Sequence, residues 1–139
     1  MSTEDNKAVF QRLLQWQMSG DLNTVDQVIT PNWDNHDGST QGYEGFKQLT
    51  AGFRSAFPGF QVEIEDMLEE GDKVAARFRL RGTNSGSLWG MPPTGKTVNV
   101  TATGIFRVLD GKVTDNWVNM DALGLMQQLG VVPAPGQGS

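Results

Sequence analysis

His36 is the single histidine of this 139-residue chain, and the chain contains no cysteine. Without cysteine there is no disulfide, thiolate nucleophile, iron–sulfur cluster or thiolate zinc site, and one imidazole excludes a site built from several histidines. We therefore expect no bound metal. Chemistry has to come from carboxylates, amides, arginines, aromatic side chains and His36, and one such carboxylate, Asp121, stands at the start of the last predicted helix.

The segment Gly90–Thr97 matches the G-x-x-x-x-G-K-T string of phosphate-binding loops. Such a loop directs backbone N–H groups at phosphate from the start of a helix. Here Pro92 and Pro93 have no N–H, and the residues after Thr97 alternate as a strand. We interpret the segment as a rigid connection between two strands and expect no nucleotide cofactor.

The overall charge argues against polyanionic partners. Eleven basic and 16 acidic residues give a net charge of −5, which opposes binding to nucleic acid and to anionic lipid. Residues 1–10 are acidic and polar rather than basic and apolar, so they do not resemble a signal peptide. No apolar run approaches 18 residues. We expect a cytoplasmic protein that binds neither nucleic acid nor membrane.

The elements that must position these residues follow from hydrophobic periodicity. Apolar residues recur at helical spacing over 9–17, 22–29 and 46–57, with an N-terminal cap at Ser2 or Thr3 and a loop or short strand over 33–43. From Phe60 the period changes to two, which predicts four strands in an antiparallel meander, followed by a short helix over 122–129. The pattern predicts one α+β domain over 1–130 and a flexible, Gly/Pro-rich tail over 131–139.

With this element order, several strings resemble the SnoaL-like polyketide cyclase family of the nuclear transport factor 2-like superfamily. The most extensive is Asp121–Gly130, which reads DALGLMQQLG. The other matching strings are Gly20-Asp21-Leu22, His36-Asp37, Ala56-Phe57-Pro58, Arg81-Gly82-Thr83, Gly90–Lys96, Phe106-Arg107 and Asp110–Val113. The resemblance covers residues 5–130.

The resemblance implies a cone-shaped fold in which a strongly curved, mostly antiparallel sheet wraps around helices and leaves a deep apolar pocket. It also implies a homodimer. Members with known chemistry close a ring in an aromatic polyketide by intramolecular aldol condensation, without metal or cofactor. The implied substrate is a hydrophobic polycyclic small molecule.

Asp121 has two interpretations. The resemblance places the catalytic aspartate of the family on this residue, and a carboxylate at the wall of an apolar pocket could take a proton from carbon and return it to the new alkoxide. Asp is also a favoured helix N-cap, and a cap alone would explain the residue. Asn119, two residues earlier, would orient the carboxylate if the strand stays regular.

His36 is the second candidate catalytic residue, and a set of large side chains are candidates for contact with the ligand. His36 follows the second helix, where it could hydrogen-bond a substrate carbonyl from the pocket mouth or lie in an exposed turn. Aromatic and sulfur-containing side chains suit stacking against a flat ligand, although core packing explains each one alone. The candidate substrate-binding residues are Trp33, Phe53, Phe57, Phe78, Trp89, Met91, Trp117 and Asn119.

Two departures from the family pattern keep other functions open. The chain has Gly104 and Asn116 where ring-closing members and many relatives have histidine. Related proteins of aromatic polyketide pathways are hydroxylases, so an oxygen-dependent hydroxylase, with reducing equivalents from a partner protein, is one alternative. A non-catalytic binder of a hydrophobic metabolite is the other.

Overall fold

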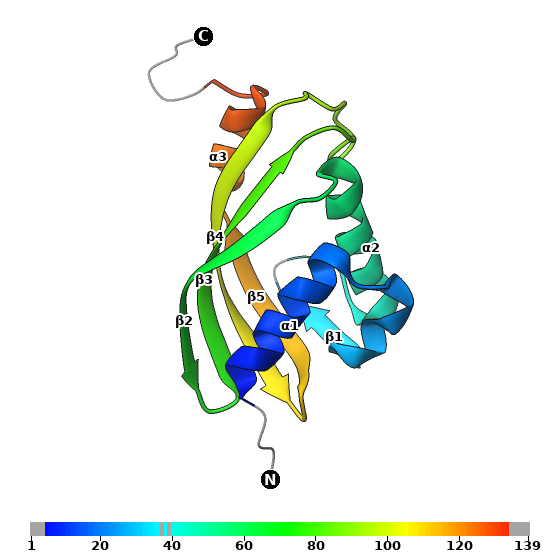
Figure 1. Ribbon diagram of the computed structural model, residues 1–139, viewed down its shortest axis with the longest axis vertical. Helices are drawn as coiled ribbons and strands as arrows, with labels where there is room; N and C mark the ends of the chain where they lie inside the picture. The colour runs from blue at the N-terminus through cyan, green and yellow to red at the C-terminus, as the bar shows by residue number, and fades with distance from the viewer. Residues whose placement is uncertain (1–4, 37, 39, 134–139) are drawn as a thin grey trace.

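The computed structural model describes residues 5–36, 38 and 40–133 (Figure 1). The elements, in chain order, are α1 (Asn6–Ser19), the 3-10 helix η1 (Leu22–Gln27), β1 (Ile29–Asn35), α2 (Gly42–Ala56), β2 (Gln61–Glu70), β3 (Lys73–Thr83), β4 (Thr97–Leu109), β5 (Lys112–Met120) and α3 (Ala122–Leu129). The predicted α+β fold is confirmed. No helix in the described part of the chain is long and apolar enough to cross a membrane.

The first helix begins at a different residue from the one predicted. Ser2 and Thr3 lie outside the described residues, and the observed N-cap is Asp5, whose carboxylate accepts a hydrogen bond from the Lys7 backbone N–H at 3.0 Å. At the other end, Arg54 of α2 donates to the backbone carbonyls of Trp16 and Gln17 at 2.6 and 2.8 Å. A cation at a helix C-terminus is favourable, so this side chain fixes α2 against the end of α1.

The sheet has the order β1-β5-β4-β3-β2. All neighbours are antiparallel except β1, which pairs in parallel with β5 at the sheet edge. The sequence pattern predicted only a loop or short strand after Trp33, but β1 already begins at Ile29 and runs through Pro31. An edge strand tolerates proline because one side of it needs no ladder donor.

Strands β3 and β4 follow the predicted alternation. Val74, Ala76 and Leu80 of β3 are buried, whereas Arg77 and Arg81 are exposed. Strand β5 departs from strict alternation, because Arg107 pairs with Asp115 while the next residue of β4, Val108, pairs with Val113. Thr114 is thus an extra residue, and such a bulge reverses the facing of every side chain after it.

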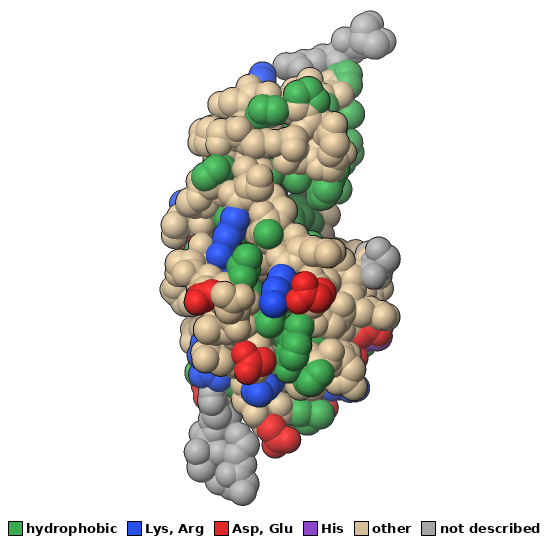
Figure 2. All heavy atoms as spheres, turned by 90° about the vertical axis from the view of Figure 1, so that its right-hand side faces the viewer, with side chains coloured by type: hydrophobic (Ala, Val, Ile, Leu, Met, Phe, Trp, Pro, Cys, Tyr) green, Lys and Arg blue, Asp and Glu red, His purple; other side chains and the backbone are tan. Residues whose placement is uncertain are grey.

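Helices α1 and α2 lie on the concave side of the curved sheet, and α3 lies at the far end of β4 (Figure 1). Two groups of buried residues form the core, one around Phe10, Trp33 and Phe106 and the other around Phe57 and Leu125. Viewed from the side of α2, the molecule narrows at mid-height and apolar side chains show in this recess (Figure 2). The fold therefore leaves space between its helices and its sheet.

Candidate active site

A cavity of about 270 Å³ lies between the helices and the concave face of the sheet. Its wall is aromatic and aliphatic, with four amide or hydroxyl side chains and no acidic, basic or histidine side chain among the lining residues. The lining residues come from every helix and strand except η1 and α3: Leu13, Leu14, Gln17, Trp33, Asn35, Phe46, Leu49, Thr50, Phe53, Phe60, Val62, Phe78, Leu80, Trp89, Val100, Ala102, Phe106, Asn116, Val118 and Met120. Such a wall favours an uncharged, largely apolar ligand.

Three side chains of the wall, Trp33, Asn35 and Asn116, form a hydrogen-bonded group. The Trp33 indole N–H donates to Asn116 Oδ1 at 2.8 Å, and Asn116 Nδ2 donates to Asn35 Oδ1 at 3.2 Å. Trp33 is fully buried and Asn116 is 5% exposed. An amide carries two N–H donors, so Asn116 keeps one beyond its bond to Asn35. The two hydrogen bonds hold the Asn116 amide in one orientation at the cavity.

Thr50 adds a polar group on the opposite wall, on α2. Its side chain is 1% exposed, and its hydroxyl has no hydrogen-bond partner within the described residues. A buried hydroxyl without a partner costs about 1–3 kcal/mol, which a ligand oxygen could offset. Thr50, Asn35 and Asn116 were not among the predicted ligand contacts, because their polar types alone do not reveal that they face a cavity.

Of the predicted substrate-binding residues, four lie in the cavity wall and four do not. Trp33, Phe53, Phe78 and Trp89 line the cavity. Among the remaining candidates, Phe57 is fully buried in the second core group, and Met91 pairs with Leu88 in a short hairpin.

Trp117 and Asn119 were expected at the cavity, but the bulge in β5 directs them to the opposite face. After Thr114, the inward positions are Asn116, Val118 and Met120, all of which line the cavity. Trp117 instead stacks on His36 outside the cavity, and Asn119 is exposed. Asn119 forms no hydrogen bond with Asp121 among those found between described residues, so the geometry gives it no orienting role.

Asp121 is exposed at the N-cap of α3 and is not in the cavity wall. Its Oδ1 accepts a hydrogen bond from the Gly124 backbone N–H at 2.9 Å. The expectation that this carboxylate is desolvated at the pocket wall is not met in this structure. The residue is nevertheless the direct neighbour of Met120, whose side chain lines the cavity.

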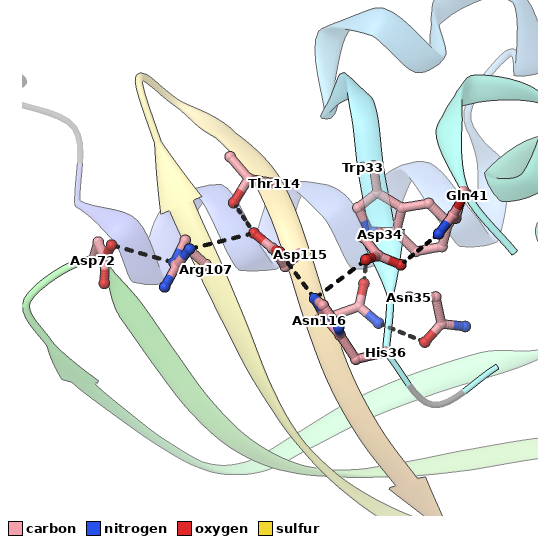
Figure 3. Close-up of polar contacts among 10 residues, drawn as sticks. All are labelled: Trp33, Asp34, Asn35, His36, Gln41, Asp72, Arg107, Thr114, Asp115 and Asn116. Carbon is pink, nitrogen blue, oxygen red and sulfur yellow. Dashed lines mark hydrogen bonds and ion pairs between the residues drawn. The ribbon is translucent and has the colours of Figure 1, made fainter. Parts of the chain in front are cut away.

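His36 is part of a charged cluster outside the cavity, formed with Asp34, Asp115 and Arg107 (Figure 3). Its Nε2 lies 3.0 Å from Asp115 and 3.6 Å from Asp34, and its ring stacks on Trp117 at 4.4 Å between centroids. Burial alone would raise the pKa of Asp115, but hydrogen bonds from His36 and Thr114, with Arg107 nearby, hold that pKa below its ordinary value. The neighbouring Asp37 lies outside the described residues. No group of side chains in the described segments has the arrangement to hold a metal ion.

Comparisons with known proteins identify the family of this chain. Residues 7–129 match the family model described as SnoaL-like polyketide cyclase. The chain is 31% identical to nogalonic acid methyl ester cyclase of Streptomyces nogalater over 81% of this chain and 87% of that protein. It is 30% identical to aklanonic acid methyl ester cyclase DnrD of Streptomyces peucetius over 75% of this chain and 72% of that protein.

A solved structure confirms the fold. TsrD from Streptomyces laurentii superposes with a TM-score of 0.85 at 26% identity, covering 95% of this chain and 99% of that one. The family model spans nearly all the described residues, from α1 to the end of α3. This chain therefore belongs to the SnoaL-like polyketide cyclase family.

Proposed function

We propose that this protein closes a ring in an aromatic polyketide by intramolecular aldol condensation, without a cofactor. The observation that carries the proposal is the cavity: it is apolar and aromatic, and its wall holds neutral hydrogen-bonding groups but no charged side chain. Two relatives are named as cyclases of methyl esters of polyketide acids. We therefore propose that the substrate is also an uncharged ester with a flat ring system.

The Asn116 amide has the role of holding a substrate oxygen. Because Trp33 and Asn35 fix its orientation, its second N–H can donate without reorganisation to the oxygen on which negative charge develops. Thr50 can hydrogen-bond a second oxygen of the ligand from α2. Both groups are neutral, so they would orient a ketone or ester without favouring a free carboxylate.

Proton transfer requires a base, and we assign this role to Asp121. In the ring closure, the base takes a proton from a carbon beside the ester carbonyl, and the resulting enolate carbon forms a bond to a ketone carbon of the same molecule. The ketone oxygen becomes an alkoxide, which takes the proton back from the base. Asp121 directly follows Met120, whose side chain lines the cavity. To reach the substrate, the Asp121 carboxylate would have to release the Gly124 backbone N–H, at a cost of about 0.5–2 kcal/mol.

The test is turnover of a methyl ester substrate of this class, with ring closure followed by mass-resolved chromatography and oxygen uptake followed by an electrode. Ring closure without oxygen uptake supports the proposal. Oxygen uptake without ring closure would instead identify a hydroxylase. Binding without turnover in either assay would identify a non-catalytic metabolite binder.

We further propose that the protein is a homodimer joined through the outer face of the sheet. On this face Ile105 is 43% exposed and lies opposite Trp117 in the ladder. Further along the sheet, Arg79 and Arg81 of β3 form ion pairs with Glu65 and Glu63 of β2. An isologous contact could cover Ile105 and satisfy both charge signs. Sedimentation should give twice the 15.2 kDa of one chain. Ile105→Glu should dissociate the dimer. The control Leu123→Glu, at an exposed position on α3, should leave the dimer intact. A wild-type mass equal to that of one chain would contradict the proposal.

A further inference from the structure

Trp89 is the most unusual residue of the cavity wall, because its backbone has a conformation that tryptophan disfavours. Its φ is +49°, and Asp110 is the only other non-glycine residue with positive φ in the described part of the chain. Asp tolerates this left-handed region because its short polar side chain can hydrogen-bond locally, whereas a bulky side chain there is a genuine outlier. Trp89 is also 59% exposed although it lines the cavity.

The local fold explains how this conformation is imposed. Leu88 and Met91 exchange two backbone hydrogen bonds, of 3.0 and 2.8 Å, so Trp89 and Gly90 form the tip of a two-residue hairpin with φ values of +49° and +80°. Leu88 is 5% exposed and packs in the second core group. The hairpin is thus anchored on one side, and its tip carries the indole to the cavity.

The segment between β3 and β4 that carries this hairpin is fixed at its base by a buried amide side chain. Asn84 is 1% exposed; its Nδ2 donates to the carbonyls of Ala56 and Gly86, and its Oδ1 accepts from the backbone and hydroxyl of Thr94. Every hydrogen-bonding atom of this side chain therefore has a partner. These bonds fix the backbone from which the hairpin projects.

A strained backbone and an exposed indole both cost free energy in the protein without ligand, and a ligand that covers the indole would offset part of this cost. We infer that Trp89 is a specificity-determining residue that stacks on a flat, conjugated ring of the substrate where the cavity opens to solvent. This inference rests on the proposed function, since it specifies which ligands the proposed polyketide site accepts. The predicted ligand extends beyond the 270 Å³ of the cavity and leaves one ring under the indole.

The test separates the backbone effect from the stacking effect. Trp89→Asn and Trp89→Gly place residues suited to positive φ at the hairpin tip, so both should raise the unfolding midpoint by about 2–6 °C. The same variants should bind the probe ligand, methyl anthraquinone-2-carboxylate, about tenfold more weakly in calorimetric titration. Trp89→Phe keeps an aromatic ring at the same φ and should retain most of the affinity without the gain in stability.

Asp110→Asn is the matched control, because it changes the other non-glycine residue with positive φ, at a turn remote from the cavity lining. It should leave probe affinity unchanged. Wild-type affinity in Trp89→Asn and Trp89→Gly would overturn the stacking role, and a lowered midpoint in both would overturn the strain. If wild type does not bind the probe, while turnover of a polyketide ester is still observed, the stacking inference fails and the proposed function stands; absence of both binding and turnover contradicts both.

Discussion

The two faces of β5 carry opposite chemistry. The inward residues Asn116, Val118 and Met120 meet an apolar cavity. The outward residue Asp115 contacts His36 (Figure 3). The next outward residue, Trp117, stacks on the His36 ring. Titratable groups near the middle of this strand are thus on the outside, and the inside offers neutral hydrogen bonds. This difference supports the proposal that the cavity binds an uncharged ligand through its shape and its carbonyl oxygens, whereas the charged cluster connects strands at the sheet edge.

The largest effect is expected at Asp121, the residue that follows β5. Asp121→Asn should lower the rate of ring closure by about a hundredfold to ten-thousandfold, because the amide cannot accept and return the proton. Asn caps a helix about as well as Asp, so thermal unfolding should be unchanged. Wild-type turnover of this variant would leave Asp121 as a cap only. Asp110→Asn, another exposed acid, is the control and should retain full turnover.

The inner face should respond to loss of its central amide. Asn116→Ala leaves the buried Trp33 N–H without its acceptor, so it should lower the free energy of unfolding by about 1–3 kcal/mol. It should also slow turnover by about a hundredfold or more, because the substrate oxygen loses a preorganised donor. The control on the outer face, Asn119→Ala, should change neither quantity. Equal effects of the two variants in urea unfolding and turnover would contradict the distinction between the faces.

The neutral wall also predicts a preference between two ligands of the same shape. A methyl ester should bind at least about tenfold more tightly than its free acid at neutral pH, because burying an unpaired carboxylate is costly and the lining residues include no cation. Affinity for the acid should rise as the pH falls and the ligand becomes neutral. Titration calorimetry of both forms at several pH values measures this preference, and tighter binding of the acid at neutral pH would exclude a neutral site.

The smallest effect is expected in the charged cluster around His36. Because the folded-state pKa of Asp115 is lowered, its carboxylate stabilises the fold at pH values above its unfolded-state pKa, near 3.8, and this contribution is lost as the pH falls through the folded-state value. Asp115→Asn should therefore reduce stability at neutral pH by up to about 1 kcal/mol, and the difference should disappear in acid. Turnover should be unaffected. A stability difference that is constant between pH 2 and 7 would exclude the ionic origin.

Much of the fold was predictable because it depends on local patterns. Period-two alternation identified β2 to β5 and the buried faces of β3 and β4, and Pro58-Gly59 marked the end of α2. Strand β1 was largely missed, since Ile29 continues an apolar pattern that also fits a helix and its partner β5 lies more than 80 residues away. The site was predicted only in part: four of the eight predicted substrate-binding residues line the cavity, and the inward direction of the Asn116 amide depends on the bulge.

The sequence by itself determined the kinds of chemistry available and the alternation that makes a curved sheet over helices. One histidine, no cysteine and the Asp121–Gly130 string are properties of the chain alone. The tertiary structure decided which residues face the cavity. A single extra residue, Thr114, turns Asn116 inward and Trp117 outward, because side chains on a strand alternate and a bulge reverses the alternation after it. This reversal depends on pairing with β4, a long-range contact that no local pattern of β5 contains.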